Sequence, residues 1–103
     1  MIVAHSCVHI GTESAEAEFL EAMRTRSREV ERFPGFVRFE FRRDARSRGR
    51  YVIATWWESK ADLRRYLASS EHRETHERLT TGARASIGPP RVEVHEVLDA
   101  SGR

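Results

Sequence analysis

The chain has 103 residues, of which 39% are hydrophobic and 33% are charged, and its net charge is only +2. This balance excludes a disordered chain and predicts one compact domain over residues 1–103 with a modest core. Every apolar run is shorter than the roughly 18 residues of a membrane span, and no basic leader precedes a long apolar segment. Cys7 is the only cysteine, which excludes an intrachain disulfide and suits a reducing compartment. We therefore expect a cytoplasmic protein with no membrane partner.

The first ten residues alternate between two faces, a period of two that predicts a strand. The more apolar face, which we expect to meet the helices, carries Ile2, Ala4, Ser6, Val8 and Ile10. His5, Cys7 and His9 point to the other side. There we expect the partly polar edge of an interface, and a small buried thiol instead of a nucleophile.

Residues 12–33 have the pattern of one helix, with Thr12 as the expected N-cap and acidic residues in the first turns. The residues near one stripe of this helix are Ala15, Phe19, Met23, Arg26 and Val30. Pro34 and Gly35 should end it, because proline does not continue a helix and glycine permits a turn.

Two further strands are predicted at residues 36–42, which alternate, and at residues 50–57, which are apolar on both faces. The second of these is typical of a central strand that is buried on both sides. The segment 41–50 between them contains five arginines. No aromatic platforms are interleaved with them, so we expect a solvated hairpin loop and no nucleic-acid partner.

Ser59 is the expected cap of a helix through Leu67, and Ser69 or Ser70 can cap a new helix after a break. A loop and a last strand follow within residues 88–98. The complete order is strand, helix, strand, strand, helix, strand. This order predicts an α+β fold of the ferredoxin-like βαββαβ type, with a four-stranded antiparallel sheet and its helices on one face.

One face of such a sheet has no helix to cover it. We expect that face to expose either one side of residues 51–57 or the apolar residues of the second strand, Val37, Phe39 and Phe41. A large apolar patch on a soluble protein usually marks an interface. We therefore predict a homodimer that packs sheet against sheet.

Three stretches appear in a fixed order along the chain: "FPGFVRFEF" at 33–41, "YVIATWWES" at 51–59 and "YLASSEHRETH" at 66–76. Together they resemble the antibiotic biosynthesis monooxygenase (ABM) family of dimeric α+β barrels. The family includes heme-degrading monooxygenases, small quinone-forming monooxygenases that need no cofactor, and many members of unknown activity. For the heme-degrading branch, the resemblance places His76 at the axial iron ligand, Tyr66 at a tryptophan position and Ser6 at an asparagine position.

Our candidate catalytic residues are accordingly Tyr66, His76 and Ser6, in a pocket between the helices and the sheet. The candidate substrate-binding residues are Trp56, Trp57, Phe19 and Arg26. The two tryptophans must point to opposite faces, and one of them should form a cavity wall, since flat aromatic molecules pack well on indole.

We expect a monooxygenase that acts on a flat aromatic or quinol-type molecule without a dedicated cofactor. The alternatives are a protein that binds or degrades heme through His76, and a module that binds a small ligand without turnover. Tyr66 and His76 lie too far apart on a continuous helix to share a small ligand, so a role for His76 requires the break at Ser69 or Ser70.

Overall fold

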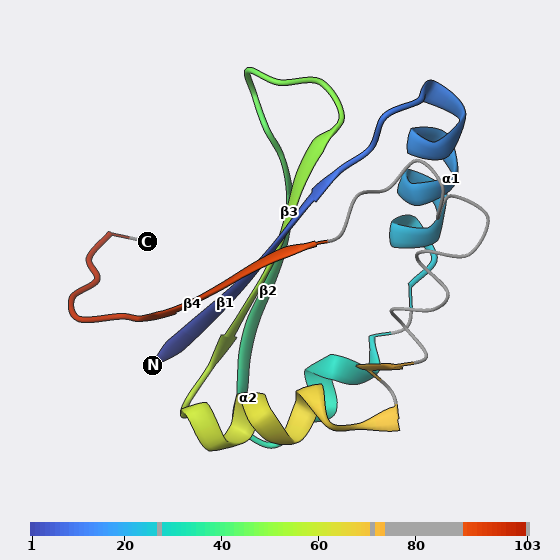
Figure 1. Ribbon diagram of the computed structural model, residues 1–103. Helices are drawn as coiled ribbons and strands as arrows, with labels where there is room; N and C mark the ends of the chain where they lie inside the picture. The colour runs from blue at the N-terminus through green and yellow to red at the C-terminus, as the bar shows by residue number, and fades with distance from the viewer. Residues whose placement is uncertain (27, 71, 74–89, 103) are drawn as a thin grey trace.

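A computed structural model describes residues 1–26, 28–70, 72–73 and 90–102 (Figure 1). The elements are β1 (Ile2–His9), α1 (Glu13–Arg24), the 3-10 helix η1 (Glu29–Arg32), β2 (Phe36–Arg43), β3 (Arg50–Trp57), α2 (Lys60–Leu67) and β4 (Arg91–Glu96). The sheet has the order β2-β3-β1-β4, and every neighbouring pair is antiparallel. The predicted ferredoxin-like α+β fold is confirmed, with β3 as one of the two central strands. None of the described helices is long and apolar enough to cross a membrane.

Both helices lie on the same side of the sheet, over different parts of it (Figure 1). Helix α1 contributes Ala15, Phe19 and Met23 to one core cluster, where they meet Val8 and Tyr51 of the sheet. Helix α2 contributes Leu63 to a second cluster, together with Ile2, Val30 and Trp57. The hydrophobic core is therefore divided into two clusters along the strands.

Strand β1 has the predicted orientation, because its even residues Ile2 and Val8 belong to these two clusters. The predicted N-caps are also confirmed. The hydroxyl of Thr12 accepts the backbone N–H of Ala15 at 3.2 Å, and that of Ser59 accepts the N–H of Asp62 at 3.2 Å. Each cap satisfies a donor that the first helical turn leaves without a partner.

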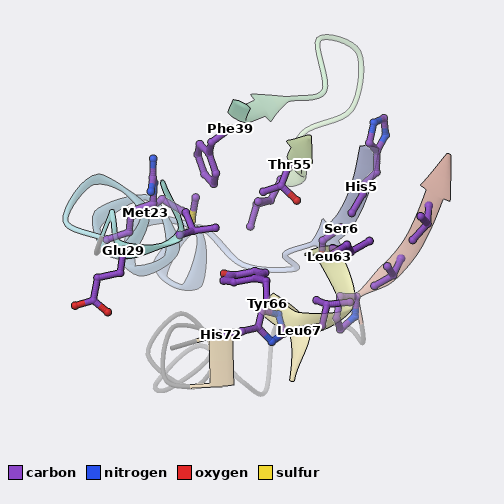
Figure 2. Close-up of a pocket in the computed structure, with 17 residues that line it drawn as sticks. His5, Ser6, Met23, Glu29, Phe39, Thr55, Leu63, Tyr66, Leu67 and His72 are labelled. Atoms are coloured by element: carbon purple, nitrogen blue, oxygen red, sulfur yellow. The ribbon is translucent and has the colours of Figure 1, made fainter. Parts of the chain in front are cut away.

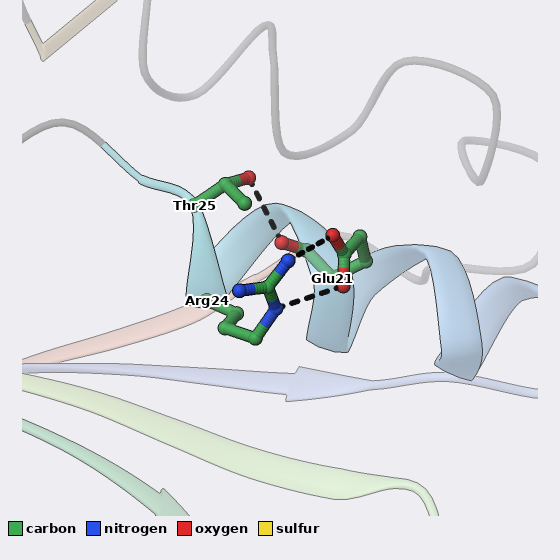
Figure 3. Close-up of polar contacts among 3 residues, drawn as sticks. All are labelled: Glu21, Arg24 and Thr25. Carbon is green, nitrogen blue, oxygen red and sulfur yellow. Dashed lines mark hydrogen bonds and ion pairs between the residues drawn. The ribbon is translucent and has the colours of Figure 1, made fainter.

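The predicted helix over 12–33 was wrong in its second half, because α1 ends at Arg24 (Figure 3). Thr25 donates both its backbone N–H, at 3.1 Å, and its hydroxyl, at 2.9 Å, to the carbonyl oxygen of Glu21. The guanidinium of Arg24 meanwhile pairs with the Glu21 carboxylate at the surface. The chain then leaves the helical path. Arg26 therefore lies after the helix and not within it, and the buried Val30 belongs to η1.

Of the two alternatives for the uncovered sheet face, the one that placed Phe39 and Phe41 there was wrong. The pairing of β2 with β3 shifts register between Phe36 and Arg38, as at a β-bulge, and leaves Val37 42% exposed. Phe39 and Phe41 pack against the core cluster beneath α1. The outer face of β2 carries Arg38, Glu40 and Arg42 instead, and both arginines form ion pairs with Glu40.

Candidate functional site

A cavity of about 340 Å³ lies between the sheet and the helices (Figure 2). Two cross-strand rows of residues form its floor. Thr55 pairs with both Phe39 and Ala4, and Ala4 pairs with Val94. The adjacent row consists of Ile53, Ser6 and Val92.

The size of the side chains on β1 explains why a cavity lies here. Ala4 and Ser6 are small, whereas Ile2 and Val8 on either side of them are large and belong to the two core clusters. A short side chain in a close-packed interior leaves room that its neighbours fill only in part. The cavity therefore opens between the two clusters, above the middle of the sheet.

The walls come from both helices and from the segment that follows α1. Met23, Arg26 and Val30 line one side, and Leu63 and Tyr66 of α2 line the other. Three further lining residues are well exposed to solvent: Leu67, Val92 and Val94. The cavity is therefore mostly apolar and reaches solvent between α2 and β4, as a binding pocket for a small molecule requires.

Tyr66 is held at the cavity wall by aromatic neighbours. Its ring stacks on Trp57, with centroids 5.1 Å apart and planes at 26°, and it meets the ring of Phe33 edge to face at 5.1 Å. Trp57 is fully buried, and its indole N–H donates to the hydroxyl of Thr55 at 2.9 Å. Rings held in this way cannot easily rotate, so Tyr66 presents a fixed flat surface at the cavity.

Arg26 brings a positive charge to the same cavity. Its guanidinium carbon lies 3.7 Å from the centroid of the Phe39 ring, the distance of a close cation–π contact. Partial burial, and to a lesser extent the neighbouring charge of Arg28, lower the pKa of Arg26. An arginine in this position favours an anionic ligand, because a guanidinium donates hydrogen bonds to oxygen anions in a fixed geometry.

The predicted break after α2 is confirmed. The helix ends at Leu67, the hydroxyl of Ser69 donates to the carbonyl of Tyr66 at 2.5 Å, and it accepts the N–H of His72 at 3.2 Å. Ser69 thus caps a new helical turn that begins at Ser70. This turn places His72 at the cavity, where its ring meets that of Tyr66 edge to face at 5.1 Å (Figure 2).

Three of the predicted site residues line the cavity together: Ser6, Arg26 and Tyr66. Neither tryptophan does, because Tyr66 covers Trp57 and because Trp56 lies on the opposite face of the sheet. Phe19 is also behind the wall, in the core cluster of α1. His76 lies outside the described residues.

Four polar residues that line the cavity were not predicted there from the sequence: His5, Glu29, Thr55 and His72. Thr55 had a detectable signal, since it is the only residue with an aliphatic hydroxyl in the apolar run 51–57 and its neighbour Ala54 points to the other face. Glu29 had none, because its place depends on the end of α1. Among the described residues, no group of three or more histidine, cysteine or acidic side chains could hold a metal ion.

The profile of the antibiotic biosynthesis monooxygenase family matches residues 1–78, and the chain therefore belongs to this family. SnoaB, a cofactor-independent oxygenase from Streptomyces nogalater, has the same fold, with a TM-score of 0.75 and 21% identity over 96% of this chain and 94% of that chain. MhuD, a heme-degrader from Mycobacterium tuberculosis with two hemes in its active site, gives a TM-score of 0.76 and 22% identity over 99% and 100%. At these identities the likeness shows a shared fold. No curated protein matches the sequence.

Proposed function

We propose that this protein is a monooxygenase that acts on a flat aromatic or quinol-type molecule, without a dedicated cofactor. One observation carries the proposal: an apolar cavity of about 340 Å³ has the fixed aromatic ring of Tyr66 on one side and the guanidinium of Arg26 on another. Membership of the ABM family supports the reaction class. The volume suits a small polycyclic aromatic, since it lies near the lower end of the range for ligand pockets.

In this mechanism the substrate supplies the electrons. Its phenolate form reduces dioxygen, one oxygen atom enters the substrate, and the other leaves as water. Tyr66 orients the flat substrate, and Arg26 stabilises the negative charge on its oxygen. The apolar floor keeps water away from the reacting atoms. Ser6 and Thr55 offer hydroxyl groups for the remaining polar atoms of the ligand.

Oxygen uptake with a panel of hydroquinones tests this proposal. Tyr66→Phe keeps the ring but removes the hydroxyl, and we expect uptake to fall about tenfold, the value of one hydrogen bond. Arg26→Gln should lower uptake by about 10-fold to 100-fold, because a charged donor is lost. Arg24→Gln is the matched control and should leave uptake unchanged. Aromatic binding without any oxygen uptake would instead identify a binding module.

A second candidate is a heme protein with His76 as the axial ligand. The helix break at Ser69, which this function requires, favours it. Bound heme would supply an iron that activates dioxygen. A hemin titration decides between this candidate and the cofactor-free monooxygenase. A Soret shift that His76→Ala abolishes would support heme binding, and the absence of a shift with the wild type would exclude the heme candidate.

We further propose a homodimer through the outer face of the sheet. Charged rows lie along both edges of that face, with Arg38, Glu40 and Arg42 on β2 and Arg91, Glu93 and His95 on β4. Half-buried Cys7, Val52 and Trp56 lie between these rows. Rows that carry both signs of charge can complement themselves across a two-fold axis. Light scattering that shows a monomer at micromolar concentration would exclude this assembly.

The small aromatic ligand and the second copy of the chain are the only partners that we propose, and the proposed location is the cytoplasm. The single cysteine supports a reducing compartment. The arginines around the hairpin loop are partly engaged within the chain, since Arg48 pairs with Glu13 and Arg43 lies over the ring of Tyr51. This engagement supports the absence of a nucleic-acid partner. A fluorescent oligonucleotide should accordingly show no binding at physiological salt.

A further inference from the structure

The proposed oxygenation, on which this inference rests, requires a proton acceptor. A neutral phenol is a poor reductant of dioxygen, whereas its phenolate is electron-rich. The phenol must therefore lose its proton inside a cavity that is mostly apolar and reaches solvent on one side. A base in the wall makes this possible at neutral pH, and it is most effective when its pKa lies close to the working pH.

Five ionisable residues line the cavity among the described residues: His5, Arg26, Glu29, Tyr66 and His72. Arginine stays protonated in proteins and cannot accept a proton. Glu29 is exposed at the rim. Imidazole is the side chain whose ordinary pKa lies nearest to neutrality, so His72 has the right chemistry for the base.

His5 also borders the cavity, but its ring serves the other face of the sheet. Figure 2 shows this ring pointing away from the cavity, and it meets the ring of His95 at 5.4 Å. The inward-facing side chains of the sheet that line the cavity, from Ala4 to Val94, carry no charge. Arg26 and Glu29 after α1, and Tyr66 on α2, are thus the titratable groups that share the cavity with His72.

The local structure holds His72 in place. The Ser69 hydroxyl binds its backbone N–H, and the edge-to-face contact with Tyr66 restricts its ring. Tyr66 is in turn fixed by Trp57. A ligand that lies against Tyr66 would therefore meet an imidazole whose position is set by the helix break.

We propose that His72 is the catalytic base that removes the phenolic proton of the bound substrate. The O–H bond of the phenol breaks, its electron pair stays on the oxygen, and the proton moves to a ring nitrogen of His72. The resulting phenolate then faces the guanidinium of Arg26 in the same cavity. His72 and Arg26 have separate tasks, since one accepts the proton and the other stabilises the anion that remains.

Binding of 4-nitrophenol tests the proton transfer without turnover, because its phenolate absorbs at longer wavelength than the phenol. The titration is done below the pKa of the free phenol. We expect wild-type protein to bind it as the phenolate, and His72→Gln to lower the bound phenolate-to-phenol ratio at least about tenfold, which corresponds to one pKa unit. His9→Gln, an exposed histidine on β1, is the matched control and should behave as the wild type.

Calorimetry in two buffers of different ionisation enthalpy shows where the proton goes. Transfer to His72 releases no proton to the buffer, so the binding enthalpies should agree. Two results would overturn the assignment of His72 as the base: release of a proton to the buffer by the wild type, or an unchanged fraction of bound phenolate in His72→Gln. Either would indicate that Arg26 alone stabilises the phenolate. Failure of the wild type to bind 4-nitrophenol would overturn the assignment as well.

Oxygen uptake separates this inference from the proposed function. If the enzyme is active, His72→Gln should lose about 100-fold at neutral pH and recover as the pH approaches the pKa of the free phenol. A pH-independent loss would indicate a structural role and contradict the assignment. Proton transfer to His72 without any oxygen uptake would support His72 as the base and overturn only the proposed oxygenase activity.

Discussion

The two tryptophans of β3 are neighbours in the chain, and they belong to the two very different faces of the sheet. Trp57 is fully buried on the helix side, where it supports Tyr66 and the cavity. Trp56 lies half-buried on the outer side, with the guanidinium carbons of Arg38 and Arg42 each 5.6 Å from its ring. One face of the sheet is an apolar core with a pocket, and the other is a mixed surface of charge and aromatic area.

This difference shows how one sheet can serve two purposes. Side chains alternate between the two faces along a strand, so residues on the core face can be substituted almost independently of those on the outer face. The ligand chemistry that we propose uses only the helix side. The proposed dimer uses only the outer side. Substitutions on the two faces should therefore differ in kind, the first acting on folding and the ligand, and the second on assembly.

A charge placed on the core face should have the largest effect. Phe41 stacks on Tyr51 and meets Phe19 edge to face, so Phe41→Glu removes these contacts and buries an unpaired carboxylate. We expect a loss in the free energy of unfolding that exceeds the roughly 3–5 kcal/mol cost of truncating a buried aromatic ring, because the unpaired carboxylate adds to it; thermal or urea denaturation measures the loss. Val52→Glu on the outer face should instead leave the chain folded and weaken the dimer. Equal unfolding by both variants would contradict the assignment of faces.

The tryptophan pair gives the next largest difference. Trp57→Ala should cost about 3–5 kcal/mol of unfolding free energy, because it leaves a cavity under Tyr66. Trp56→Ala removes a half-buried ring and two long cation–π contacts, each worth about 0.5–1 kcal/mol at an exposed site, and should cost less. Urea denaturation followed by circular dichroism measures both. If Trp56→Ala costs as much as Trp57→Ala, the outer face is more important for folding than we infer.

His5 should make the outer face sensitive to pH. Burial, followed by the charges of Arg42 and His95, lowers the pKa of His5 below its ordinary value, and Glu93 and Glu40 oppose this only in part. The unfolded chain therefore binds a proton more readily than the folded one. Stability should fall as the pH decreases through the window between the ordinary pKa and the lowered one.

His5→Gln removes this proton linkage and should flatten the pH dependence of the melting temperature in that window. Arg42 and Glu40 remain in place in this variant, so the change isolates the imidazole. An unchanged slope would show that other groups, such as His95 or residues elsewhere in the chain, cause the acid sensitivity. Melting curves at several values of pH between about 5 and 7 are sufficient for this measurement.

The smallest effect should come from the surface arginine next to the pocket. Arg24 and Glu21 form an exposed pair, and the hydrogen bond from Arg24 lowers the pKa of Glu21 (Figure 3). Exposed pairs contribute little to stability, so Arg24→Gln should leave the melting temperature almost unchanged. Arg26→Gln, two residues later, should leave the fold intact but weaken 4-nitrophenolate binding measurably. Equal binding by the two variants would remove Arg26 from the site.

Much of the fold was predictable because its signals are local. Strand alternation, the caps at Thr12 and Ser59 and the break at Ser69 each depend on a few adjacent residues. The end of α1 was not predictable in the same way. The apolar stripe of the predicted helix continues to Val30. In the structure, the hydroxyl of Thr25 instead donates to the carbonyl of Glu21 at the end of α1, and the buried Val30 belongs to η1.

The cavity shows a similar division. Ser6 and Tyr66 were predicted from the face of β1 and the resemblance to the family, and both line it. The place of Trp57 behind Tyr66 depends on how α2 packs against β3, which no local pattern encodes. The inward turn of Phe39 depends on a one-residue shift in pairing between two strands.

By itself, the sequence determined the order of the elements, the two faces of each regular strand and the membership of the ABM family, because periodicity and short motifs are properties of neighbouring residues. Only the tertiary structure decided which aromatic rings meet and where the cavity lies. It also decided that Arg26 and His72, which lie far apart in the sequence, line the same cavity. These features depend on packing between distant segments, where the volume of one side chain and a single shift of register change which groups come into contact.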